Sequence, residues 1–143
     1  MSADRQVLLV RHAHAEWPGY EGPDFDRPLT PRGEADAQRT AEAMRAEGHA
    51  PVMIIASPAR RTRQTAEIIA RELGAPAGGL HFIETLYNGS PVTLEAELRQ
   101  ALAQVEGLVM LVAHNPGISE LARDLAPGTP YFSPADWRLV ALR

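Results

Sequence analysis

The chain has 143 residues, a formal net charge of −4, 45% apolar residues and 22% charged residues, which suits a single globular domain over residues 1–143. The negative charge offers no basic face for nucleic acid or an anionic membrane, and the absence of cysteine excludes disulfides, thiolate metal sites and cysteine nucleophiles. The first apolar run is shorter than the about 7 to 15 residues of a secretion signal, and no run approaches membrane-spanning length, so we expect a cytoplasmic protein.

The first half of the chain alternates between strand-like and helical segments. Residues 7–10 form an apolar run, residues 17–28 are too rich in Gly, Pro and Asp for regular structure, and residues 32–47 have helical spacing. A second apolar run at 52–56 precedes a second helical segment at 59–73. Neither apolar run alternates with polar residues, which is typical of strands that are buried on both faces of a sheet.

The second half of the chain repeats this order. A helical segment at 92–105 is followed by a third apolar run at 108–113, and residues 138–142 would add a strand at an edge. Strands that alternate with helices predict a mostly parallel sheet covered on both faces, which is a three-layer α/β/α sandwich. A capping residue followed by proline marks the expected helix starts, at Thr30-Pro31, Ser57-Pro58, Ser90-Pro91 and Asn115-Pro116.

Histidines and arginines follow the three apolar runs at the points where these end. The segments concerned are Arg11-His12-Ala13-His14, Ser57 to Arg61, and His114 to Gly117. Ligands of parallel sheets bind at the carboxyl ends of the strands, so we expect these side chains to meet at one edge. One arginine can donate two parallel hydrogen bonds to the oxygens of a phosphate. The helix starts at Ser57 and Asn115 would direct backbone N–H groups to the same place. The sequence predicts a site for a dianion, with Ser57 and Asn115 binding substrate.

These motifs resemble those of the histidine phosphatase superfamily, in its phosphoglycerate-mutase-like branch. The family's opening Arg-His-Gly appears as Arg11-His12-Ala13, its Leu-Thr-x-x-Gly helix start as Leu29 to Gly33, its Ser-Pro-x-x-Arg-x-x-Gln-Thr segment as Ser57 to Thr65, and its late histidine as His114. The short chain and the Arg-Pro-Leu-Thr stretch at 27–30 are similar to SixA-type phosphohistidine phosphatases. The resemblance covers nearly the whole chain and implies a phosphoglycerate-mutase-like fold.

The resemblance also implies roles for the matched residues. His12 is the expected nucleophile, with Arg11, Arg61 and His114 around the phosphoryl group and Arg27 as a further contact. Nearby arginine charges should lower the pKa of His12 and keep its lone pair available. Water would then hydrolyse the phosphohistidine, and the reaction needs no metal or organic cofactor.

Three positions leave alternatives open at this stage. Ala13 replaces the family's glycine and restricts the backbone beside the nucleophile more than glycine would. Glu84 stands where this branch often has a general acid after its third strand, and a solvated loop carboxylate is an equal alternative. In an extended segment His14 would point to the same side as His12, two residues earlier, so we expect it at the rim of the site.

Two other enzyme classes are less consistent with the sequence. The pair Asp24 and Asp26 is similar to the paired aspartates of haloacid-dehalogenase phosphatases, but no apolar strand precedes it. His12-Ala13-His14 has the spacing of a metal-binding pair in barrel hydrolases, but such a barrel takes about 250 residues.

The expected function is hydrolysis of a phosphoryl group through a phospho-His12 intermediate. A chain without room for a large lid should leave its site open, which favours a phosphorylated protein, such as a histidine phosphotransfer domain carrying phosphohistidine. A phosphomonoesterase acting on a small phosphorylated metabolite is the closest alternative. A non-catalytic module that recognises phosphorylated partners is less consistent with an intact nucleophile.

Overall fold

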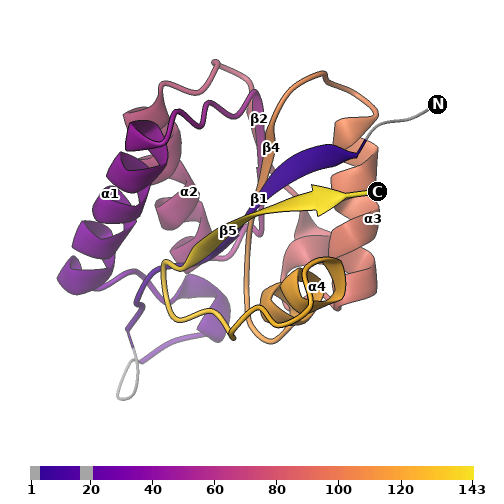
Figure 1. Cartoon of the computed structure of the whole chain (residues 1–143). Coiled ribbons are helices and arrows are strands. Elements are labelled where there is room, and N and C mark those ends of the chain that lie inside the picture. Colours follow the sequence, from indigo (N-terminus) through magenta and orange to yellow (C-terminus); the bar gives the residue numbers. More distant parts are fainter. Residues whose placement is uncertain (1–3, 17–20) are drawn as a thin grey trace.

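The computed structural model describes residues 4–16 and 21–143, and within them five strands form one sheet in the order β3-β2-β4-β1-β5 (Figure 1). The strands are β1 Arg5–Arg11, β2 Met53–Ala56, β3 Leu80–Phe82, β4 Val109–Ala113 and β5 Trp137–Leu142. All neighbouring pairs are parallel except β5, which lies antiparallel to β1 at one edge. The expected edge strand and the mostly parallel sheet are therefore confirmed.

Helices cover both faces of this sheet and complete the three layers (Figure 1). The helices α1 Pro31–Ala46 and α2 Arg60–Leu73 pack on one face, and α3 Pro91–Leu102 and α4 Gly117–Leu125 pack on the other. Successive residues of β1 point to opposite faces, so Leu8 joins the core beneath α1 and α2 while Leu9 joins the core beneath α3 and α4. Both side chains are fully buried, which explains why the sequence of this strand lacks alternation.

Two of the expected helix starts are confirmed, and two begin later than expected. Thr30 Oγ1 accepts a hydrogen bond from the Gly33 N–H and Ser90 Oγ accepts one from the Thr93 N–H, each with proline as the first helical residue. By contrast, α2 begins at Arg60 and α4 at Gly117, and neither has a side-chain cap. The reason is that the Ser57 and Asn115 side chains bond to the late histidine and to a following loop instead, at 2.8 Å and 2.9 Å.

The segment 17–28 was expected to lack regular structure, and it contains one short 3-10 helix, η1 Asp24–Asp26. Residues 17–20 lie outside the described residues. Two elements had no predicted range: β3, which is only three residues long, and α4, for which the sequence indicated only a start. Among the described residues no helix is long and apolar enough to cross a membrane.

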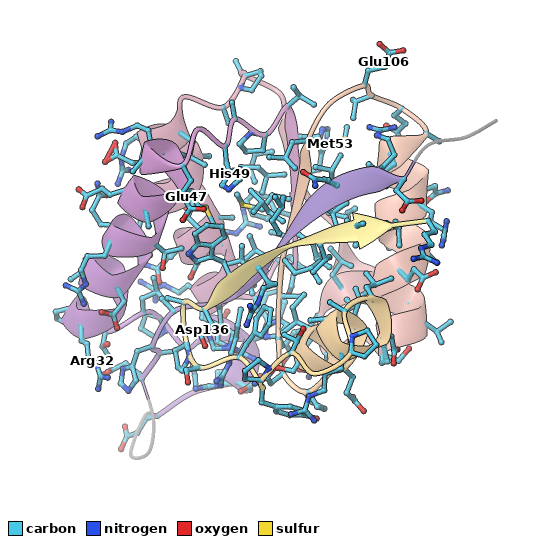
Figure 2. The ribbon with its side chains drawn as sticks, in the orientation of Figure 1. Arg32, Glu47, His49, Met53, Glu106 and Asp136 are labelled. Atoms are coloured by element: carbon cyan, nitrogen blue, oxygen red, sulfur yellow. The ribbon has the colours of Figure 1, made fainter. Side chains whose placement is uncertain are left out.

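The carboxyl ends of β1, β2 and β4 lie at the same edge of the sheet. There the Arg11 N–H at the end of β1 donates to the carbonyl of Asp136, just before β5. Figure 2 places Asp136 at this end of the molecule, whereas Met53 and Glu106 lie toward the opposite end. Parallel topology thus brings the segments after three strands together.

Candidate active site

A pocket of about 560 Å³ opens at the carboxyl ends of β1 and β4. Six of the eight residues that the sequence nominates for the site line it: Arg11, His12, Arg27, Arg61, His114 and Asn115. The seventh, Ser57, is fully buried and bonds to the His114 ring. The eighth, Glu84, is exposed on a short 3-10 helix, η2 Glu84–Leu86, and is not part of the pocket lining.

His12 lies directly after β1 and is held by backbone contacts. Its N–H donates to the Ala113 carbonyl of β4 at 3.1 Å, and its ring Nδ1 lies 2.8 Å from the Ala13 carbonyl. Because a carbonyl only accepts, the neutral ring carries its proton on Nδ1 and its lone pair on Nε2. The side chain is only 7% exposed.

The charge of His12 is set by its surroundings. Burial, opposed by the Ala13 hydrogen bond and reinforced by the charges of Arg61, Arg11 and Arg27, lowers its pKa from 6.5 to about 3. The ring is therefore neutral near pH 7, as the nearby arginines led us to expect.

The segment that carries the nucleophile packs on the Ser-Pro-x-x-Arg-x-x-Gln-Thr motif at residues 57–65. The Ala13 N–H donates to Thr65 Oγ1 at 3.0 Å, and the Leu29 N–H donates to Gln64 Oε1 at 2.8 Å. These bonds give the Gln-Thr end of that motif a structural role, which the sequence analysis did not assign. Of the described non-glycine residues only Asn88 and Ala135 have positive φ, so Ala13 has a backbone conformation that is open to alanine.

Gly33 is required where α1 begins. A Cβ at this position would overlap the carbonyl oxygen of His14, which itself accepts the Thr30 N–H at 3.0 Å. The first turn of α1 therefore packs directly on the chain just after His12. This contact explains the glycine of the Leu-Thr-x-x-Gly motif.

His114 follows β4 and faces His12, with the two ring centroids 5.3 Å apart. Its Nε2 lies 2.8 Å from Ser57 Oγ, and that hydroxyl accepts the Ala59 N–H. The Ser57 hydroxyl has one proton and two acceptor lone pairs, so it can donate to Nε2 or accept from it, and each direction corresponds to one tautomer of the neutral His114 ring. Burial, with the charges of neighbouring His12 and Arg61, lowers the pKa of His114 to about 2.

Three arginines reach the pocket from separate segments. Arg61, in the first turn of α2, is 3% exposed, and its Nη1 and Nη2 donate to the backbone oxygen and Oδ2 of Asp24. Arg27 Nε donates to Asp24 Oδ1 at 2.9 Å. Arg11, at the end of β1, donates through Nη1 to the Phe132 carbonyl at 3.0 Å.

Three buried side-chain nitrogens have no hydrogen-bond partner among the described residues, and all belong to this pocket: Arg11 Nε, Arg61 Nε and His114 Nδ1. Buried donors in native proteins are normally paired. Arginine has no acceptor atom, so the guanidinium groups of Arg11 and Arg61 contribute only N–H donors and positive charge. A pocket lined by such groups suits a ligand that only accepts.

Sequence reasoning missed Asp24 and Tyr87. Asp24 was set aside as a member of an unrelated aspartate pair, yet it lines the pocket and bonds to Arg61 and Arg27. The Asp-x-x-Arg spacing from Asp24 to Arg27 was a usable signal, since residues three apart pair on a helical turn. Tyr87 donates to Asp24 Oδ2 at 2.6 Å, and no feature of the sequence indicated this long-range bond.

Three further side chains near the site are His14, Arg60 and Arg63. His14 lines the pocket, and its Nδ1 lies 2.8 Å from Thr30 Oγ1. Arg60 is exposed, whereas Arg63 packs over the Phe82 ring at 3.9 Å from the centroid. In the described part of the chain, no group of three or more His, Asp or Glu side chains is arranged to hold a metal ion.

The sequence profile of the histidine phosphatase superfamily, branch 1, matches residues 7–86, more than half of the chain, including the segments that carry His12 and Arg61. The chain belongs to this superfamily. Its members are phosphatases and mutases that use a histidine nucleophile, so the resemblance read from the motifs is confirmed.

The fold has close counterparts among solved structures. A candidate SixA phosphohistidine phosphatase of Agrobacterium tumefaciens superposes with a TM-score of 0.83 at 28% identity, over 94% of this chain and 90% of that one. The protein histidine phosphatase SixA complexed with tungstate gives a TM-score of 0.83 at 24% identity, over 94% and 86%. These matches confirm the phosphoglycerate-mutase-like fold.

An uncharacterized chloroplastic protein of Arabidopsis thaliana is 31% identical over 134 residues. The match takes in 87% of this chain and 61% of the plant protein, so the chain spans about three fifths of that relative's length.

Proposed function

We propose that this protein is a phosphatase in which His12 Nε2 accepts the phosphoryl group of the substrate and water then removes it. The observation that carries the proposal is a neutral His12, with its lone pair on Nε2, in a pocket that is also lined by Arg11, Arg27 and Arg61. A transferring phosphoryl group carries its charge on three equatorial oxygens, and catalysis consists mostly of positioning and of stabilising that charge.

The first step forms a bond between His12 Nε2 and phosphorus and breaks the bond from phosphorus to the leaving group. Arg11 and Arg61 stabilise the equatorial oxygens with fixed positive charge. The Nδ1–H to Ala13 carbonyl bond holds the imidazole in the reactive tautomer and stabilises the ring as it becomes positively charged. In the second step water attacks phosphorus, the Nε2–P bond breaks, and neutral His12 and inorganic phosphate are produced.

We further propose a protein phosphohistidine as the substrate. The likeness in fold and sequence to the A. tumefaciens SixA candidate supports this substrate class. So does the chemistry of the pocket, in which Asp24 is the one carboxylate among the described lining residues. Although burial raises the pKa of Asp24, the bond from Tyr87 and the charge of Arg61 outweigh burial and lower it to about 2. Asp24 is therefore ionised and cannot protonate a leaving group.

The ionised state of Asp24 separates the two candidate substrate classes. An alkoxide leaves poorly unless an acid protonates it, and such help is worth about 10² to 10⁴ in rate. An imidazole leaves readily once solvent protonates its distant nitrogen. A pocket with an ionised Asp24 suits the second leaving group better. A small-molecule phosphomonoester is the alternative substrate. Its leaving oxygen would need a proton from Glu84 or from another acid that comes close to it.

The test is to label the protein with a radioactive phosphohistidine protein and, separately, with a phosphomonoester, and to quench with acid or base. The wild type is expected to carry acid-labile, base-stable label and to turn over the phosphohistidine protein faster. His12→Ala should carry no label, whereas His81→Ala, which changes an exposed histidine on β3, should behave as the wild type. Acid-stable label, or label that survives in His12→Ala, would contradict the nucleophile assignment.

A further inference from the structure

The η1 turn directs one carboxylate into the pocket. Asp24 Oδ2 accepts from Arg61 Nη2 at 3.0 Å and from the Tyr87 hydroxyl at 2.6 Å, and Asp24 Oδ1 accepts from Arg27 Nε at 2.9 Å. The backbone oxygen of Asp24 accepts from Arg61 Nη1 at 2.8 Å. One residue thus contacts both arginines that the phosphoryl group would meet on this side of the pocket.

This arrangement fixes the orientation of Arg61. Its guanidinium is planar, so two bonds to Asp24 from Nη1 and Nη2 leave only one orientation for Nε. Nε is the nitrogen that is buried without a partner among the described residues. A long arginine side chain loses rotamer entropy when a ligand orders it, and Asp24 already orders Arg61 before the substrate arrives.

The same carboxylate sets the charge of the pocket. Arg11, Arg27 and Arg61 supply three positive charges and Asp24 one negative charge, and His114 and His12 are neutral near pH 7 because their pKa values are lowered to about 2 and 3. Leaving His14 aside, the wall carries a net charge of +2. That charge matches a phosphoryl dianion without exceeding it. Without Asp24 the wall would hold inorganic phosphate, the product, more tightly.

We propose that Asp24 is a positioning residue, which orients Arg61 and Arg27 for the phosphoryl group and limits the affinity of the pocket for the product. Tyr87 supports it by fixing Oδ2. The proposal rests on the proposed function for its kinetic part only. The orientation of Arg61 and the affinity for inorganic phosphate are properties of the folded protein that can be measured whether or not turnover occurs.

The experiment compares the wild type with Asp24→Asn, Tyr87→Phe and the matched control Asp26→Asn, an exposed carboxylate on the same turn. Circular dichroism checks that each variant is folded. Single-turnover transfer of phosphate to His12 gives the rate of the chemical step, and calorimetric titration with inorganic phosphate gives its dissociation constant. The Arg61 Nε–H resonance, assigned with an Arg61→Lys variant, reports whether the guanidinium is fixed.

Loss of orientation by about 1 Å costs up to about 100-fold in rate, so Asp24→Asn should slow transfer by about 10- to 100-fold. The same variant should bind inorganic phosphate as tightly as the wild type or several-fold more tightly. Its Arg61 Nε–H resonance should broaden. Tyr87→Phe should change the transfer rate, the phosphate affinity and the Arg61 resonance in the same directions but by less. Asp26→Asn should match the wild type in all three measurements.

This combination of slower transfer and undiminished phosphate affinity is what separates positioning from mere structural support, which would weaken both. Unchanged transfer in Asp24→Asn, or weaker phosphate binding by a folded Asp24→Asn, would overturn the proposal. If wild-type protein transfers no phosphate, the proposed function has failed. The Arg61 resonance and the phosphate affinity then decide on Asp24 alone, and an unchanged resonance with unchanged affinity would overturn its role.

Discussion

Neutral buried histidines make the stability of this protein depend on pH in a calculable way. Burial lowers the pKa of His12 from 6.5 to about 3 and that of His114 from 6.5 to about 2. In the unfolded chain both rings return to the ordinary value near 6.5. Between about pH 3 and 6.5 the unfolded state therefore binds two protons that the folded state does not.

The sign follows from proton linkage. A state that binds more protons is favoured as pH falls, so the free energy of unfolding must decrease as pH drops below about 6.5. Each ring contributes a slope of about 1.4 kcal/mol per pH unit, and the two together about 2.7 kcal/mol per pH unit, once the unfolded chain is largely protonated. Over two pH units this loss is comparable with the whole stability of many domains.

The assay is denaturant unfolding followed by circular dichroism at half-unit steps from pH 7 to pH 4. Ionised carboxylates such as Asp24 add their own pH dependence, but that background is shared with the variants. His12→Gln and His114→Gln should each reduce the slope between pH 5.5 and 4 by about 1.4 kcal/mol per pH unit, and the double variant should lose both contributions. Parallel curves for wild type and variants would mean that the folded protein protonates these rings as the unfolded chain does, and the argument for a neutral nucleophile would fail.

Two substitutions test the site and its support. Arg61→Ala should weaken transition-state stabilisation by about 2.7 to 4 kcal/mol, measured as kcat/KM, whereas Arg60→Ala, which removes the exposed neighbouring side chain, should change it little; equal losses would show that the motif is misaligned. Gly33→Ala forces a methyl group against the His14 carbonyl oxygen, and thermal unfolding should show a loss of about 1 to 3 kcal/mol; an unchanged melting temperature would mean that the contact relaxes freely.

The sequence was informative about this fold where residues are buried on both sides. The central strands β1, β2 and β4 consist of apolar runs because each face meets a helix layer. The edge strand β3 is three residues long and only partly covered, so its sequence has no pattern to detect. The convergence of His12, Arg61 and His114 was also predictable, because parallel strands present their carboxyl ends at one edge of the sheet.

The contacts of Asp24 with Arg61 and Tyr87, unlike its short-range contact with Arg27, lie beyond such reasoning. Its partners Arg61 and Tyr87 are 37 and 63 residues away along the chain, and the conformation of the η1 and η2 turns decides whether they meet. Turn conformations of this kind depend on the tertiary fold more than on local propensity. A carboxylate in a Gly- and Pro-rich segment therefore gives no sign by itself that it faces a pocket.

Glu84 provides the last prediction, because its place in the structure bears on the leaving group. Its side chain is exposed on η2 and is not part of the pocket lining, although Tyr87 at the end of the same turn bonds to the pocket carboxylate Asp24. Only a substrate whose leaving group extends over η2 could meet the Glu84 carboxyl group.

Glu84→Gln keeps the size of the side chain and removes its proton, and both substrate classes should be measured with it. If a phosphohistidine protein is the substrate, its turnover should be nearly unchanged. Turnover of any phosphomonoester should instead fall, by at most the factor of about 10² to 10⁴ that a general acid contributes to the rate. Equal large losses on both substrates would identify Glu84 as a true general acid and favour the small-molecule phosphatase. No loss on either would leave Glu84 a solvated carboxylate, and the leaving group would then depend on solvent alone for its proton.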